Sequence, residues 1–160
     1  MSEAPKTTVP LAPTRPRQPP GRLLGVDYGA RRVGLALSDA DRRIAVPLAI
    51  HDRQGNPHNT GYFQQLIQKE AITGIVVGLP MHMHGEEGAS AQQARQYGTW
   101  LKRLTKLPVV FWNERLTSSH AETLMVEAGL KPKQRKERLD KVAAQILLQC
   151  FLDSGCPEMP

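Results

Sequence analysis

The stretch LLGVDYGARRVGLALSD, residues 23–39, contains two short apolar segments joined by a glycine and a charged turn. The first segment ends at Gly29, and the second begins at Val33. Apolar runs of this length around a tight polar turn are typical of a β-hairpin. A third run, RIAVPLAI at 43–50, contains Pro47, which cannot donate to a strand ladder and so favours a sheet edge. The sequence therefore predicts three antiparallel strands.

The next part of the chain alternates between helical and strand patterns. Phe63 and Leu66 recur at helical spacing before ITGIVVGLP, residues 72–80. A second amphipathic segment precedes LPVVFWNE, residues 107–114. Each helix–strand unit predicts a parallel strand added beside the hairpin through a right-handed crossover.

Two further helices are expected to close the chain. One spans about 118–128 and is ended by Gly129 and Pro132, and the other spans about 136–153. The complete pattern predicts an α/β domain with a five-stranded mixed sheet, three antiparallel strands followed by two parallel ones, and helices on both faces.

Length and composition fit a single domain within 160 residues. We expect a disordered, proline-rich basic tail at 1–21, the folded domain at 22–155 and a short C-terminal tail at 156–160. No segment reaches the roughly 20 apolar residues of a membrane helix, and the first residues lack the apolar centre of a secretory signal. Cys150 and Cys156 fit neither a disulfide framework nor a zinc site. A cytoplasmic protein without membrane contact is the expectation.

The chain is basic, with a formal net charge of +6 and an isoelectric point near 9.6. Such a balance favours a polyanionic partner, because phosphates attract the surface and release counterions on binding. A well-solvated basic surface without a partner is the alternative.

Two acids stand at the ends of predicted strands. Asp27 precedes Gly29, and Glu114 closes the run VVFWNE. Binding sites in open α/β sheets gather beyond the carboxyl ends of parallel strands, where a buried acid is costly without a cation or donors. The alternatives are a turn cap for Asp27 and, for Glu114, a pair with Arg115 or a solvated loop position.

A third acid, Asp140, lies in the last predicted helix and shares a face with Ala144 and Leu147. The small residues Ala143 and Ala144 would allow this helix to approach the sheet closely. A first-turn acid favoured by the helix dipole is the alternative. Three carboxylates at one end of a sheet suit Mg²⁺ or Mn²⁺, and two such ions can drive phosphodiester hydrolysis.

Four blocks of the sequence resemble the YqgF/RuvX family: LLGVDYGARRVGLALSD, IVVGLP, NERLTSSHAE and LDKVAAQILLQ. The resemblance covers about residues 22–153. It implies a ribonuclease H-like fold related to Holliday junction resolvases, a role as a nuclease of pre-16S ribosomal RNA, and dependence on Mg²⁺ or Mn²⁺. It places the family's acidic triad, both catalytic and metal-binding, on Asp27, Glu114 and Asp140.

Two positions depart from the family pattern. Asn113 stands where Asp is more frequent, which would remove a fourth carboxylate near the metals and alter metal affinity. In the loop MHMHGEEG, His82 and His84 replace the more usual Asn and Asp. These histidines are either loop residues or ligands of a transition metal.

Basic and polar residues near the three acids are candidates for contacting substrate phosphates. They are Arg31, Arg32, Arg115, Thr117 and Lys136. Thr117 is also a helix N-cap candidate, and Lys136 belongs to a basic run that could be a solvated face.

Three functions remain open at this point. The resemblance favours RNA processing, which a monomer could perform, whereas resolution of branched DNA would need the paired sites of a homodimer. A non-catalytic RNA-binding ribosome assembly factor would explain the charge but not the acids. An actin-like or sugar-kinase-like ATPase would need a second domain, for which 160 residues leave no room.

Overall fold

The computed structural model describes residues 4, 18–29, 31–53, 55–80, 87–114 and 129–160, with the backbone alone for residues 135–141. The elements in chain order are β1 (Arg22–Tyr28), β2 (Arg32–Ser38), β3 (Ala45–Asp52), α1 (Thr60–Lys69), β4 (Ile72–Leu79), α2 (Ala89–Thr105), β5 (Val109–Asn113) and α4 (Pro132–Asp153). The helix expected at 118–128 and most of the expected N-terminal tail lie outside the described residues.

The five strands form one mixed sheet in the order β3-β2-β1-β4-β5. β1 pairs antiparallel with β2 and parallel with β4, which in turn pairs parallel with β5. The predicted sheet is therefore confirmed, including its three antiparallel strands. β3 is an edge strand, and Pro47 lies beside a register shift against β2, where the missing N–H disturbs the ladder least.

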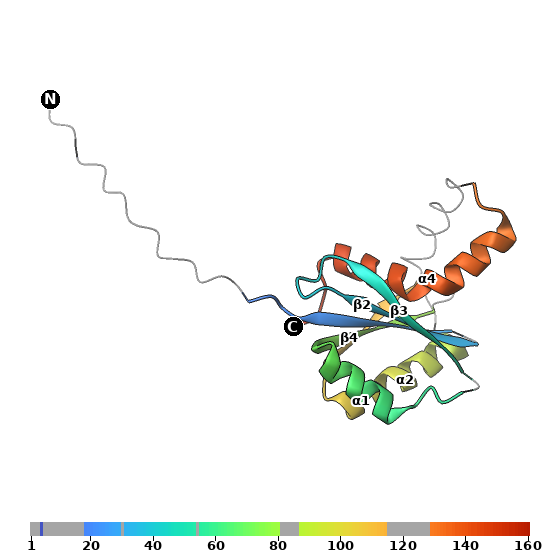
Figure 1. Cartoon of the computed structure of the whole chain (residues 1–160), viewed down its shortest axis with the longest axis horizontal. Helices are drawn as coiled ribbons and strands as arrows, with labels where there is room; N and C mark the ends of the chain where they lie inside the picture. The colour runs from blue at the N-terminus through green and yellow to red at the C-terminus, as the bar shows by residue number, and fades with distance from the viewer. Residues whose placement is uncertain (1–3, 5–17, 30, 54, 81–86, 115–128) are drawn as a thin grey trace.

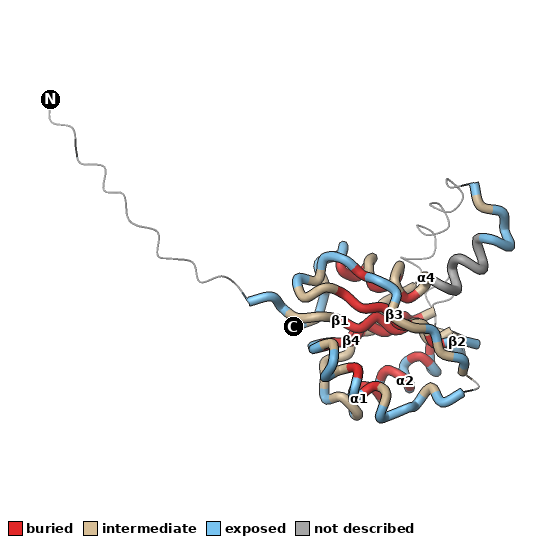
Figure 2. The backbone as a smooth tube through the Cα atoms, viewed as in Figure 1, coloured by how far each residue is buried: buried red, intermediate tan, exposed pale blue. Residues whose placement is uncertain are grey.

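Helices cover both faces of the sheet, as predicted (Figure 1). α1 and α2 pack on one face, where Phe63 and Tyr97 meet Leu24 and Val26 of β1. α4 packs on the other face, where Phe151 meets Leu23. Buried residues are concentrated in the central strands and on the inner sides of the helices (Figure 2). No helix among the described residues is long and apolar enough to cross a membrane.

α4 lies unusually close to the sheet because it crosses two glycines. A Cβ built on Gly25 would lie 2.8 Å from the Cβ of Leu148, and one on Gly34 would lie 3.3 Å from that of Ala144. The close approach expected from the small residues of this helix is confirmed for Ala144. This contact sets the height of α4 above β1 and β2.

Local signals explain most of the helix ends. Asn59 caps α1 by accepting a hydrogen bond from the Tyr62 N–H at 3.1 Å. The predicted start of the last helix at about 136 was wrong, because α4 begins at Pro132. Proline fits the first helical position, where its missing N–H costs nothing, and the Gln134 side chain accepts from the Lys131 N–H at 3.0 Å.

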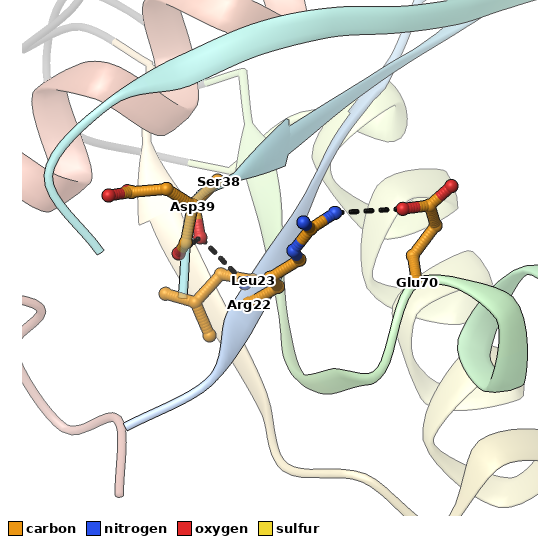
Figure 3. A network of polar contacts seen from close by, with 5 residues as sticks. All are labelled: Arg22, Leu23, Ser38, Asp39 and Glu70. Carbon is orange, nitrogen blue, oxygen red and sulfur yellow. Dashed lines mark hydrogen bonds and ion pairs between the residues drawn. The ribbon is translucent and has the colours of Figure 1, made fainter. Parts of the chain in front are cut away.

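Polar contacts hold the start of β1. The hydroxyl of Ser38, 2% exposed, accepts from the Leu23 N–H at 2.8 Å and donates to the Asp39 carbonyl. The Arg22 guanidinium pairs with Glu70 at 2.8 Å (Figure 3). This end of the sheet is thus tied to β2 and to the end of α1.

Arg42 binds both ends of the described domain. Its guanidinium donates to the carbonyls of Pro20, Gly21 and Pro160 and to the Thr73 hydroxyl. Residues 156–160 therefore lie beside the start of β1 (Figure 1).

Truncating the core beneath α4 tests this packing. Phe151 is 0% exposed and contacts Trp112 edge to face. We expect Phe151→Ala to lower the free energy of unfolding by about 3–5 kcal/mol, because it leaves a cavity between α4 and the sheet. Urea denaturation measures the change. Ile44→Ala, at a position 62% exposed, is the control and should cost less than about 1 kcal/mol.

Candidate metal centre

Asp27 lies near the end of β1, on the face that α4 covers. Leu23 and Gly25, at alternate positions before it, both contact α4. Because strand side chains alternate between faces, Asp27 projects from the same side. Its partner on β2 is Gly34, which presents no side chain beside the carboxylate.

Glu114 directly follows β5, where its N–H donates to the Leu79 carbonyl at 3.0 Å. Its side chain reaches back over β4: a Cβ built on Gly78 would lie 2.5 Å from Oε1 of Glu114. The Glu114 carboxyl forms a hydrogen bond with that of Asp27. The two acids thus meet across the intervening strand, and the bare backbone at Gly78 leaves the space in which they do so.

The burial of these acids has an electrostatic consequence. Desolvation, followed by the negative charge of Asp27 and the hydrogen bond with it, raises the pKa of Glu114 to about 8. Near neutral pH the metal-free pair therefore holds a proton between its carboxyl groups. A divalent cation bound to the same oxygens would take the place of that proton, so this donor set fits a hard cation such as Mg²⁺ or Mn²⁺.

Asp140 lies in α4, one turn before Ala144. From Leu148 to Ala144 the helix passes from Gly25 to Gly34, towards the end of β1 that carries Asp27. Since Gly34 is the direct partner of Asp27, Ala144 is level with Asp27, and one further turn, a rise of about 6 Å, places the backbone of Asp140 beyond Asp27, towards the turn that follows β1. Its side chain is outside the described residues, and no three potential ligands gather among the side chains that are described.

Some of the other residues predicted for the site lie in the described part of the chain, and others do not. Arg31, in the turn that follows β1, and Arg32, the first residue of β2, are both exposed. Asn113, the last residue of β5, alternates with Trp112 and so lies on the face opposite α4. Its place in the strand therefore does not support the prediction that Asn113 removes a fourth carboxylate from the neighbourhood of the metals. The loop histidines His82 and His84, the residues Arg115 and Thr117, and the side chain of Lys136 lie outside the described residues.

Gly78 was not among the residues predicted from the sequence to belong to the site. The glycine interrupts the β-branched run ITGIVVGLP, and a glycine inside a strand often marks a close approach by another group. The sequence pattern therefore indicated a close approach at Gly78, but it did not identify the side chain that makes it.

The sequence matches a known protein family. The model described as "RuvX: Holliday junction resolvase" matches residues 21–154. The chain belongs to the RuvX family. Two of the relatives that carry the name "Putative pre-16S rRNA nuclease" match most of this chain. One, from Syntrophomonas wolfei, is 40% identical over 134 residues, covering 84% of this chain and 95% of the relative. The other, from a Roseiflexus species, is 42% identical over 137 residues, covering 84% and 96%.

A solved structure supports the fold of this RuvX family member. RuvC from T. thermophilus, in complex with a Holliday junction substrate, superposes with a TM-score of 0.51 at 14% identity. The match covers 84% of this chain and 96% of RuvC. At this identity the likeness concerns architecture alone, and it confirms the expected ribonuclease H-like fold.

Adding one methyl group at Gly78 should disrupt the carboxyl pair. We expect Gly78→Ala to displace Glu114 and to weaken Mn²⁺ binding by at least about 10-fold, in the range seen when groups that orient metal ligands are lost. Titration calorimetry with Mn²⁺ measures the affinity. Gly61→Ala in α1, where the nearest atom would lie 3.8 Å away, is the control. Unchanged Mn²⁺ affinity in Gly78→Ala would contradict the assignment.

The raised pKa of Glu114 predicts how the stability of the metal-free protein depends on pH. Below the ordinary value of 4.5 the group is protonated in both the folded and the unfolded chain. Between that value and about pH 8, the Glu114 carboxyl ionises in the unfolded chain but stays largely protonated in the folded chain. Stability in EDTA should therefore fall across this window.

Thermal unfolding of wild type and Glu114→Gln across that pH range isolates the contribution. The variant should lack this part of the decline, because its amide does not ionise. Adding Mn²⁺ at pH 8 should stabilise the wild type more than the variant. Parallel pH profiles for the two proteins would argue against a protonated carboxyl pair.

Proposed function

We propose that this chain is a divalent-metal-dependent nuclease that processes the 5′ end of pre-16S ribosomal RNA in the cytoplasm. The observation that carries the proposal is the half-buried pair Asp27 and Glu114, whose carboxyl groups meet beneath α4. Two acids held together in this way are unfavourable when both are ionised. A cation relieves the repulsion and at the same time attracts a phosphodiester, which acids alone would repel.

The residues of the site have distinct proposed roles. Asp27, at the centre of the sheet between Gly34 and β4, would be the central carboxylate ligand of the divalent ions. Glu114, which follows β5, and Asp140 of α4 would supply further carboxylate ligands. Bound Mg²⁺ or Mn²⁺ supplies water activation and charge neutralisation at the reacting phosphate and its leaving oxygen. Arg31, Arg32, Arg115, Thr117 and Lys136 are proposed to position the phosphates on either side.

The substrate assignment rests on the relatives. Proteins about 40% identical over nearly their full length are named for pre-16S rRNA. The net charge of +6 suits an RNA partner. Cleavage of a single RNA strand needs one site, so a monomer suffices.

Resolution of a Holliday junction is the second candidate, favoured by the description of the family model. It requires cuts on paired strands and therefore two sites related by symmetry, as in a homodimer.

A side-by-side cleavage assay tests both candidates. Labelled pre-16S RNA and a synthetic four-way DNA junction are incubated with Mg²⁺ or Mn²⁺ and with wild type, Asp27→Asn or Asp41→Asn. Asp41 is an exposed acid in the turn between β2 and β3 and serves as the matched control. We expect metal-dependent cleavage of the RNA by wild type and by Asp41→Asn, and none by Asp27→Asn.

Cleavage of the junction alone would transfer the assignment to branched DNA. Cleavage of RNA by a folded Asp27→Asn protein would remove the basis of the proposed mechanism. If no protein cuts either substrate but all bind RNA equally, a non-catalytic role in ribosome assembly replaces the nuclease.

A further inference from the structure

Arg53 contacts the segment that follows Asp27 in three ways. Its backbone N–H donates to the Arg31 carbonyl at 2.9 Å, and Nη1 donates to the Gly29 carbonyl at 3.1 Å. Its guanidinium carbon lies 4.4 Å from the centre of the Tyr28 ring. Arg53 comes just after β3, so these contacts join the edge strand to the turn between β1 and β2.

The contacted turn is short and exposed. It is closed by a hydrogen bond from the Gly29 N–H to the Arg32 carbonyl at 2.9 Å, and the exposed residues Arg31, in the turn, and Arg32, at the start of β2, lie at this end of the sheet. Arg53 binds the carbonyls of Gly29 and Arg31. The bond to the Arg31 carbonyl comes from the Arg53 backbone and persists in any side-chain variant, whereas the bond to the Gly29 carbonyl and the contact with the Tyr28 ring depend on the guanidinium. Without the guanidinium the Gly29 carbonyl would depend on water.

Arg53 is itself supported by the core. The Tyr28 ring stacks on Tyr97 with centroids 4.5 Å apart. Tyr97 is 2% exposed, and its hydroxyl donates to the Pro57 carbonyl at 2.6 Å. Nη2 of Arg53 reaches Gln93 of α2 at 3.4 Å. The guanidinium thus connects the turn, through the half-buried Tyr28 ring, to the buried side chain of Tyr97.

We propose that Arg53 is a positioning residue, which fixes the turn between β1 and β2 so that Arg31 and Arg32 meet the phosphates of the RNA. The proposal rests on the proposed function, since it assigns phosphate contact to those two arginines. Arginine is required because a planar guanidinium can lie over the Tyr28 ring and donate in two directions, whereas a lysine ammonium has no such plane.

RNA affinity, measured without cleavage, is the test. All proteins carry Asp27→Asn, and fluorescence anisotropy in Mg²⁺ follows binding to a labelled fragment from the 5′ end of pre-16S RNA. Adding Arg53→Ala or Arg53→Lys should weaken binding about 3- to 10-fold, the effect of losing one or two such contacts. Arg43→Ala removes the same charge from an exposed position before β3, and Tyr28→Phe keeps the ring. Both controls should bind like the parent.

A double-mutant cycle separates positioning from direct contact. If Arg53 acts through the turn, Arg53→Ala should weaken binding less than about 2-fold once Arg31 and Arg32 are already alanine. The proposal would be overturned if the effects of the Arg53 and Arg31/Arg32 substitutions on binding free energy were fully additive. It would also be overturned if Arg53→Lys bound normally while Arg53→Ala bound weakly. Either result would show that Arg53 acts as a charge on phosphate. If Arg53→Ala is unfolded by thermal melting, Arg53→Lys alone decides.

The nuclease and the positioning role can fail separately. A wild type that binds but never cuts the RNA would refute the nuclease, while the binding data would still judge Arg53. A parent that does not bind this RNA at all would overturn the positioning role as well.

Discussion

The repulsion between two half-buried carboxyl groups in contact is the constraint on which the α4 face of this domain depends. Asp27 and Glu114 come from strands that are not neighbours, and they meet only because Gly78 leaves the backbone of β4 bare between them. On the same face of the sheet, Gly34 of β2 has no side chain, so Ala144 of α4 packs directly against it. In the absence of a cation, a shared proton limits the repulsion and raises the pKa of Glu114. These small residues therefore leave room for two carboxyl groups whose removal from water is costly in free energy.

The fold could be predicted from the sequence largely because its signals are local. Alternating apolar runs, a tight charged turn and Pro47 indicated the three antiparallel strands and the edge position of the third, and the structure confirms them. Pro132 was interpreted only as a signal that follows a helix, whereas it occupies the first turn of α4, so the predicted start of that helix at about 136 was wrong. Which of these applies depends on the residues around it in space.

The candidate site was accessible from the sequence in part. Asp27 and Glu114 stood out because each is an acid at a strand end, and the structure brings them together. The contribution of Gly78 depends on a side chain 36 positions away in the chain reaching across β4, and that of Arg53 depends on a turn more than 20 positions earlier. Such long-range contacts leave no periodic pattern in the sequence. Asp140 as a ligand and the undescribed basic residues stay predictions.

The contacts of Arg42 have a consequence for how the chain can be connected. One guanidinium holds the carbonyls of Pro20 and Pro160, so the two ends of the described domain lie within the span of a single side chain. They gather at the start of β1, whereas Asp27 lies towards its other end. A short linker could join residue 160 to residue 20 and new ends could be opened at another surface turn, giving a circular permutant with the same sheet. The order of the strands along the chain is therefore separable from their order in space.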